Sequence, residues 1–234
     1  MRKRATWLAA MIWLMLLCRF ITGQDLLDRG AFVIYNQGKT VGSEEFNIRI
    51  LNGKGDIQST TSYEISHENR QIRVTLESTL SFAEHLVPLA YDLSSTTNQA
   101  KQSLQVEFKP KLAVCIFTLA AGQQTLAVIL PEGVSVVDEN MFSHWSMVLA
   151  RFDLKVKGTQ RFFVFVPQMG SGGLGEVLVR YVERARIKVG AHSYRAHHYS
   201  VTTSSLTLEI WQDQTGRILR IKSPQNQAEV VRAQ

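Results

Sequence analysis

The sequence predicts a mainly β protein in which an antiparallel sheet curls into a half-barrel around one amphipathic helix. Three observations lead to this prediction: apolar and polar residues alternate in several segments, turn-forming residues separate these segments, and one stretch has a helical period instead. A period of two places every second side chain on the same face of a strand, which is typical of a sheet with one buried face.

The alternation is clearest in three segments, whose apolar positions are Phe46, Ile48 and Ile50, then Ile72, Val74 and Leu76, then Leu104, Val106 and Phe108. Turn-forming residues follow at 52–56, 68–69, 98 and 121–122, with spacings that suit successive hairpins. We therefore expect a meander.

Two later segments, 114–119 and 162–166, are apolar at nearly every position, which predicts strands covered on both faces. The second ends at Pro167, which cannot continue a central strand. After a glycine-rich loop at 170–175, we expect strands near 177–181, 187–189, 194–201, 206–211 and 217–221, the last two joined by a turn at 213–216. Because no linker composition interrupts the chain, we expect one domain over 24–234.

From Asp138 to Asp153 the apolar period is helical, and Asp138 is suited to cap the helix. A sheet curled around a single helix need not fill its hollow completely. We therefore predict that apolar residues of this segment contact a ligand there: Met141, Phe142, Trp145 and Phe152. The same side chains, together with Phe162, Phe163 and Phe165, could instead fill the core.

The first 23 residues read as a signal peptide. Arg2, Lys3 and Arg4 form a basic start, and an uncharged apolar run follows up to Arg19. The run is shorter than the ~20 residues that cross a bilayer, so we expect cleavage after Gly23 and no membrane span afterwards. Lipidation of Cys18 is the weaker alternative, because large Leu17 precedes it.

Removal of this segment changes the charge and cysteine count. Subtracting four basic residues from 26 leaves 22 against 20 acidic ones, so the remaining chain is close to neutral and the sequence offers no warrant for a nucleic-acid partner. Cys115 would be the only remaining cysteine, and its apolar neighbours predict a buried thiol.

Residue types that could carry chemistry do not form a convincing catalytic or metal-binding pattern. Ser143 and His144 point about 100° apart on a helix, so they do not share a hydrogen bond naturally, and Asp138 has its role as a cap. His197 and His198 face opposite sides of a regular strand, so at most one of them joins His192 or Glu209 in a given site. We expect exposed strand histidines, no metal, no cofactor and no enzymatic activity.

The glycines of 170–175 have no Lys-Ser/Thr pair after them and lack the spacing of a nucleophile elbow. We expect a hairpin loop rather than a phosphate cradle.

Four short segments carry a family resemblance: 42–46, 136–140, 165–168 and 211–217. Together they resemble exported bacterial proteins of a domain family of unknown function, and proteins of that kind look like the half-barrel of the periplasmic lipoprotein carriers LolA and LolB. The resemblance implies a curled sheet around an apolar cavity, but the chain differs from those carriers in size and has no lipid-handling motif.

Three functions follow as hypotheses. The first is a periplasmic or secreted protein that binds an apolar ligand such as a lipid acyl chain. The second is an envelope structural or interaction module with a filled core and exposed sheet edges. The third and weakest is a hydrolase in which Ser143 or a histidine meets a carboxylate in space.

Overall fold

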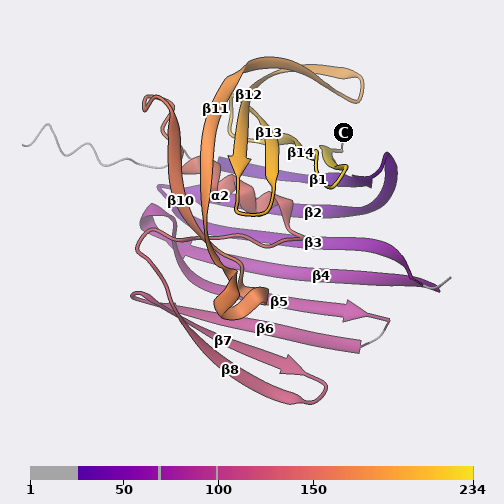
Figure 1. The fold of residues 1–234 in the computed structure, drawn as a ribbon, viewed down its shortest axis with the longest axis vertical. Helices are drawn as coiled ribbons and strands as arrows, with labels where there is room; N and C mark the ends of the chain where they lie inside the picture. Colours follow the sequence, from indigo (N-terminus) through magenta and orange to yellow (C-terminus); the bar gives the residue numbers. More distant parts are fainter. Residues whose placement is uncertain (1–25, 68–69, 99, 234) are drawn as a thin grey trace, which may run out of the picture.

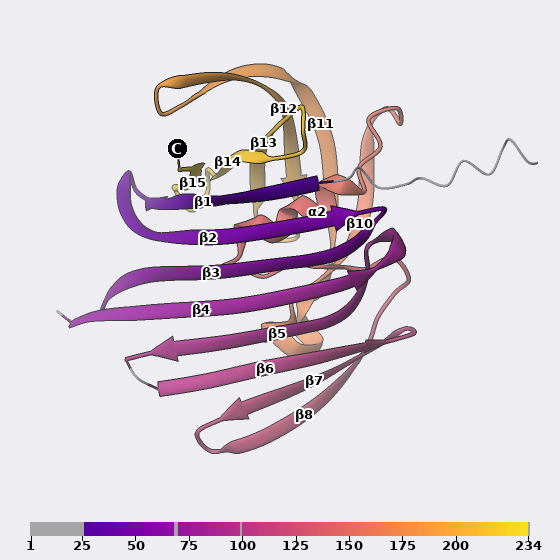
Figure 2. The ribbon, with the colours of Figure 1, turned by 180° about the vertical axis from the view of Figure 1, so that it is seen from behind.

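The computed structural model describes residues 26–67, 70–98 and 100–233. The predicted signal peptide lies outside these residues. Within them, fifteen strands form a continuous curled sheet, which confirms the predicted mainly β, half-barrel architecture (Figures 1 and 2).

The first eight strands form the predicted antiparallel meander, in which each strand pairs with the next. They are β1 (Leu26–Asn36), β2 (Lys39–Leu51), β3 (Lys54–His67), β4 (Arg70–Ala83), β5 (Val87–Thr97), β6 (Ala100–Lys109), β7 (Leu112–Leu119) and β8 (Gly122–Ile129). Asn52 and Gly53, with φ angles of 52° and 72°, turn the chain between β2 and β3 as the sequence predicts.

The remaining strands complete the curl. They are β9 (Ser135–Val136), β10 (Thr159–Phe165), β11 (Leu174–Val189), β12 (His192–Thr202), β13 (Thr207–Asp213), β14 (Ile218–Ser223) and β15 (Ala228–Arg232). β15 pairs with β1 and thereby joins the two parts of the sheet, whereas β8 and β9 remain its two edges. Two predicted strands, 177–181 and 187–189, are in fact parts of the single strand β11, which continues through a bulge near Tyr181.

The helical segment is shorter than predicted. It consists of the 3-10 turn η2 (Phe142–His144) and helix α2 (Trp145–Ala150), while η1 (Glu84–Leu86) and η3 (Pro167–Gly173) are short turns elsewhere. The predicted helix start at Asp138 is wrong, because Asp138 and Met141 form an isolated β-bridge. α2 lies behind β10 to β12 in Figure 1 and behind the first strands in Figure 2, so the curled sheet encloses it.

The core lies on the concave face of the sheet. Side chains at alternate positions are buried there, as in β2, where Phe46, Ile48 and Ile50 are at most 4% exposed. Cys115 is also buried, as predicted. The prediction that β7 is covered on both faces is wrong, because Val114 and Ile116 remain partly exposed on the convex face.

The glycine-rich segment joins β10 to β11 through η3, and these two strands pair in antiparallel fashion. This confirms the predicted hairpin connection. The turn at 213–216 also forms, with Gly216 at a φ of 88° and the Asp213 carboxylate accepting hydrogen bonds from the backbone N–H groups of Thr215 and Arg217.

Candidate ligand-binding site

The four residues that the sequence offers as ligand contacts lie inside the curl. Met141 and Trp145 are buried and belong to the main hydrophobic core, and Phe142 and Phe152 are half-buried and pack against it. None of the four lines the cavity described below. Their role as ligand contacts stays a prediction.

A buried carboxylate holds the start of the helical segment. Glu44 of β2 accepts hydrogen bonds from the backbone N–H groups of Phe142 at 2.8 Å and Ser143 at 3.2 Å, and from the Ser143 hydroxyl at 2.5 Å. The Ser59 hydroxyl lies 2.6 Å from that of Ser143. Burial raises the pKa of Glu44 to about 7, and the hydrogen bonds from Ser143, Phe142 and Ser59 oppose this rise. Glu44 therefore satisfies the free N–H groups at the start of the helical segment, as a capping side chain does, although it lies on β2.

Asp138 has a different role from the predicted helix cap. Its carboxylate accepts hydrogen bonds from the Asn140 backbone N–H at 2.9 Å, from Gln168 Nε2 at 2.7 Å and from the Tyr91 hydroxyl. Neither η2 nor α2 has a side-chain cap at its own N-terminal residue. Asp138 thus ties the stretch before η2 to β5 through Tyr91 and to η3 through Gln168.

Ser143 and His144 do not hydrogen-bond to one another, as expected from their adjacent places on a helix. The Ser143 hydroxyl pairs with Glu44 and Ser59, whereas both ring nitrogens of His144 are buried without a partner in the described structure. Burial lowers the pKa of His144 to about 4, against an opposing effect of Asp138. Ser143 is 1% exposed, so this group does not offer a reachable nucleophile.

His197 and His198 lie on opposite faces of β12, as predicted, but they are half-buried rather than exposed. His198 Nε2 lies 2.5 Å from the Glu209 carboxylate, and its ring stacks on Trp211 with centroids 4.4 Å apart. The His197 ring contacts the Tyr181 ring on the other face. Across the described residues, no three His, Cys, Asp or Glu side chains are placed to hold a metal ion.

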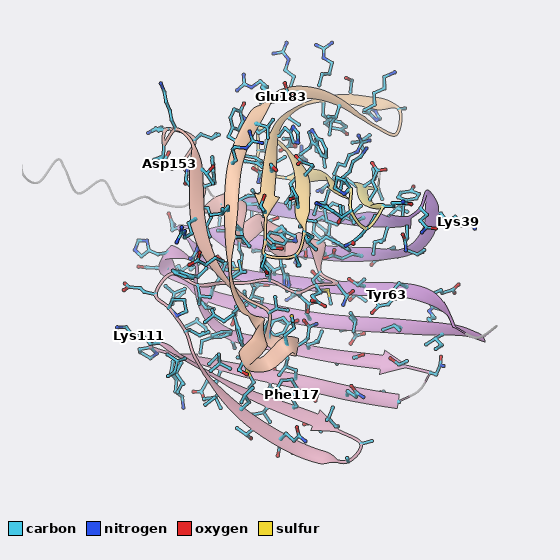
Figure 3. The ribbon with its side chains drawn as sticks, viewed as in Figure 1. Lys39, Tyr63, Lys111, Phe117, Asp153 and Glu183 are labelled. Atoms are coloured by element: carbon cyan, nitrogen blue, oxygen red, sulfur yellow. The ribbon has the colours of Figure 1, made fainter. Side chains whose placement is uncertain are left out.

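A cavity of about 440 Å³ lies on the concave face, between the sheet and the segments that carry Asn140 and Gln168. Figure 3 labels Tyr63 of β3 and Phe117 of β7, which come from the two outer strands of its wall. Its apolar wall consists of Val74, Leu76, Leu93, Leu104, Phe117 and Leu119, and its polar residues are Tyr63, Ser95, Thr97, Gln102, Ser103, Asn140 and Gln168. Gln102 is exposed, so the cavity reaches solvent near the start of β6.

A larger hollow of about 740 Å³ crosses β1 to β6. Outward-facing polar side chains such as Gln58, Glu77 and Asp92 line it on the convex face. We place the candidate site in the smaller cavity, because an apolar wall facing the interior of a half-barrel favours ligand uptake more than a polar outer surface does.

The sequence reasoning missed Glu44, Ser59, Tyr91 and Gln168. A signal was available for Glu44, because it lies two residues before Phe46 and continues the alternation Phe46, Ile48, Ile50 onto the buried face. The same alternation places Ser59 inside with Ile57. No local pattern indicates that Gln168 meets Asp138.

Comparisons with known proteins support the fold. No protein-family model matches the chain, and the search of curated proteins finds no match. Among solved structures, the chain is similar to a β-barrel-like protein of the domain of unknown function DUF1849 from Brucella abortus, with a TM-score of 0.61 and 5% identity over 89% of this chain and 95% of that one. It is also similar to a DUF1089 family protein from Pseudomonas aeruginosa, with a TM-score of 0.53 and 10% identity over 80% of this chain and 91% of that one.

These likenesses show the fold: a curled, β-barrel-like domain, which this chain shares with two bacterial proteins of unknown-function families. At such low identity they show the fold alone. No helix in the described part of the chain has the length and apolar character needed to cross a membrane.

Proposed function

We propose that this protein is an exported, non-enzymatic binding protein whose half-barrel takes up an apolar ligand, such as a lipid acyl chain, in the concave-face cavity. The observation that carries the proposal is the cavity itself. Its volume of about 440 Å³ falls within the roughly 300–1,000 Å³ of pockets that hold small molecules. The basic and apolar start of the sequence supports export to a periplasm or to the outside of the cell.

Ligand uptake can be tested with two tryptophan variants on one strand. Ser95 lines the cavity, whereas its neighbour Thr96 faces the convex side of β5. We expect Ser95→Trp to fill the cavity and to weaken binding of the neutral dye Nile red at least about tenfold, and Thr96→Trp to bind like the unaltered protein. Equal binding by all three proteins would exclude this cavity as the site.

The natural ligand can be sought in the protein recovered from its own compartment. Native mass spectrometry followed by organic extraction is expected to show a stoichiometric apolar molecule. A protein that is empty and takes up no Nile red would contradict the proposal.

One observation favours the interaction module as a second candidate. The edge strand β8 carries no charged residue, and its Ile129 is 79% exposed. Natural edge strands are usually protected by charges or proline, since an unprotected edge pairs readily with another strand. If β8 pairs with β8 of a second copy, the protein should self-associate in analytical ultracentrifugation. Ala127→Lys on β8 should abolish this self-association, whereas Thr79→Lys in the middle of the convex face should not.

A further inference from the structure

The cavity differs in its charge from the two other hollows described. No side chain that lines it is ionised at neutral pH, since the polar ones are hydroxyls and amides. By contrast, the hollow on the convex face includes Arg29, Glu77 and Asp92, and a third hollow near the start of β2 includes Lys39, Glu64 and Arg73. The concave cavity therefore offers no cation to pair with an acidic headgroup.

An acidic side chain, Asp138, is hydrogen-bonded to the cavity wall. Asp138 is buried directly behind two lining residues, because Gln168 Nε2 donates to its Oδ2 and the Asn140 backbone N–H donates to its Oδ1. Within the described chain, Asp138 has hydrogen-bond donors but no salt-bridge partner. Burial raises the pKa of the lining residue Tyr63, and the Asp138 carboxylate adds to this rise.

We propose that the cavity selects a neutral amphiphile, an apolar chain that ends in a hydroxyl or amide group, over an anionic lipid such as a fatty-acid carboxylate. This inference rests on the proposed ligand-binding function. A carboxylate entering the cavity would lose water without gaining a cation, and Asp138 lies behind the wall on the side of Asn140 and Gln168. A hydroxyl loses less solvation, and Ser95, Thr97 and Gln102 offer it hydrogen-bonding groups on the wall.

The selectivity can be measured with two probes of the same chain length, lauryl alcohol and laurate, as competitors of Nile red. The titration is done at pH about 8, where a free carboxylic acid is ionised. We expect the alcohol to displace the dye at a concentration on the order of tenfold lower than laurate. Laurate that displaces the dye as well as the alcohol, or better, would overturn the inference while leaving the binding function intact.

A failure of the proposed function looks different, since the protein would then bind neither Nile red nor either probe. A charge variant separates the headgroup preference from general effects. Gln102 is exposed and lines the cavity, so Gln102→Lys places a cation there with little strain. We expect it to bring laurate to parity with the alcohol or beyond.

The matched control is Gln105→Lys, which lies on the opposite face of the same strand and lines the convex hollow. It should retain the preference for the alcohol. If both lysine variants change the preference equally, the effect arises from overall charge and the inference fails.

Discussion

The hydroxyl of Ser143 lies 2.5 Å from Oε1 of Glu44, a carboxylate that precedes it by 99 residues. This contact fixes the start of the helical segment to the concave face of β2. Both residues are buried, Glu44 at 0% and Ser143 at 1% exposure. Hydrogen bonds to a buried carboxylate are among the stronger ones in a protein, because water cannot replace a lost donor.

We expect Ser143→Ala to lower the free energy of unfolding by about 1–3 kcal/mol, since Glu44 loses its hydroxyl donor and remains buried. Urea denaturation followed by circular dichroism measures the change. Ser146→Ala, at a buried serine of α2, is the matched control, since the hydrogen bonds of Glu44 go to Phe142 and Ser143. A Ser143→Ala protein as stable as the control would show that the contact contributes nothing.

Glu44 should make the protein less stable as the pH rises. Its pKa is raised from 4.5 to about 7 in the folded state, so its contribution is fully present below pH 4.5 and is lost as the pH rises through 7. The full loss is roughly 3 kcal/mol. Glu44→Gln removes the titrating group. In a series of denaturation curves from pH 5 to pH 8, the free energy of unfolding of the variant should therefore rise relative to that of the unaltered protein. A constant difference would contradict the raised pKa.

His144 should have the opposite effect. Its pKa is lowered from 6.5 to about 4. Its contribution to stability is therefore fully present above pH 6.5 and is lost as the pH falls through 4, where the buried ring must take up a proton. We expect His144→Phe to lose this acid sensitivity, and to be neutral or slightly stabilising at pH 7 because it removes two buried nitrogens that have no partners in the described structure. If acid unfolds both proteins at the same pH, the lowered pKa of His144 is contradicted.

Glu44 lowers and His144 raises the free energy of unfolding as the pH increases. These two effects oppose each other where both groups titrate, between pH 4.5 and 6.5. The unaltered protein should therefore show little net change from this pair in that window. Each single variant should reveal the slope of the other group, and the double variant should show neither. A double variant that keeps either slope would assign that slope to a different residue.

An ion pair crosses the seam between β1 and β15, whose backbones also pair along five residues. The Arg232 guanidinium donates to both oxygens of Asp28, at 2.9 and 2.5 Å, and Asp28 is only 3% exposed in its side chain. We expect Arg232→Leu to cost about 3–5 kcal/mol, because it leaves a buried carboxylate unpaired, and Asp28→Leu combined with it to recover part of this loss. Thermal and urea unfolding test both; a loss below about 1 kcal/mol would show that water or another group satisfies Asp28.

Alternation and turn residues were sufficient to predict most strands, since each depends on residues close together in the chain. The phase of β2 even places Glu44 on the buried face with Phe46. The helical segment was predicted too long because its period continues through Asp138, whereas in the structure Asp138 bridges to Met141 and bonds to Tyr91 and Gln168. The local pattern thus identified the helix but not its start.

The sequence by itself determined the fold class, most of the strands and the buried face of those strands that alternate, because side-chain direction in a strand follows from position alone. Only the tertiary structure decided that Glu44 meets Ser143, that Asp138 supports Asn140 and Gln168, and that an uncharged cavity remains beside them. Glu44 and Ser143 are 99 positions apart and Asp138 and Gln168 are 30 apart, so the curl of the whole sheet sets which of them meet.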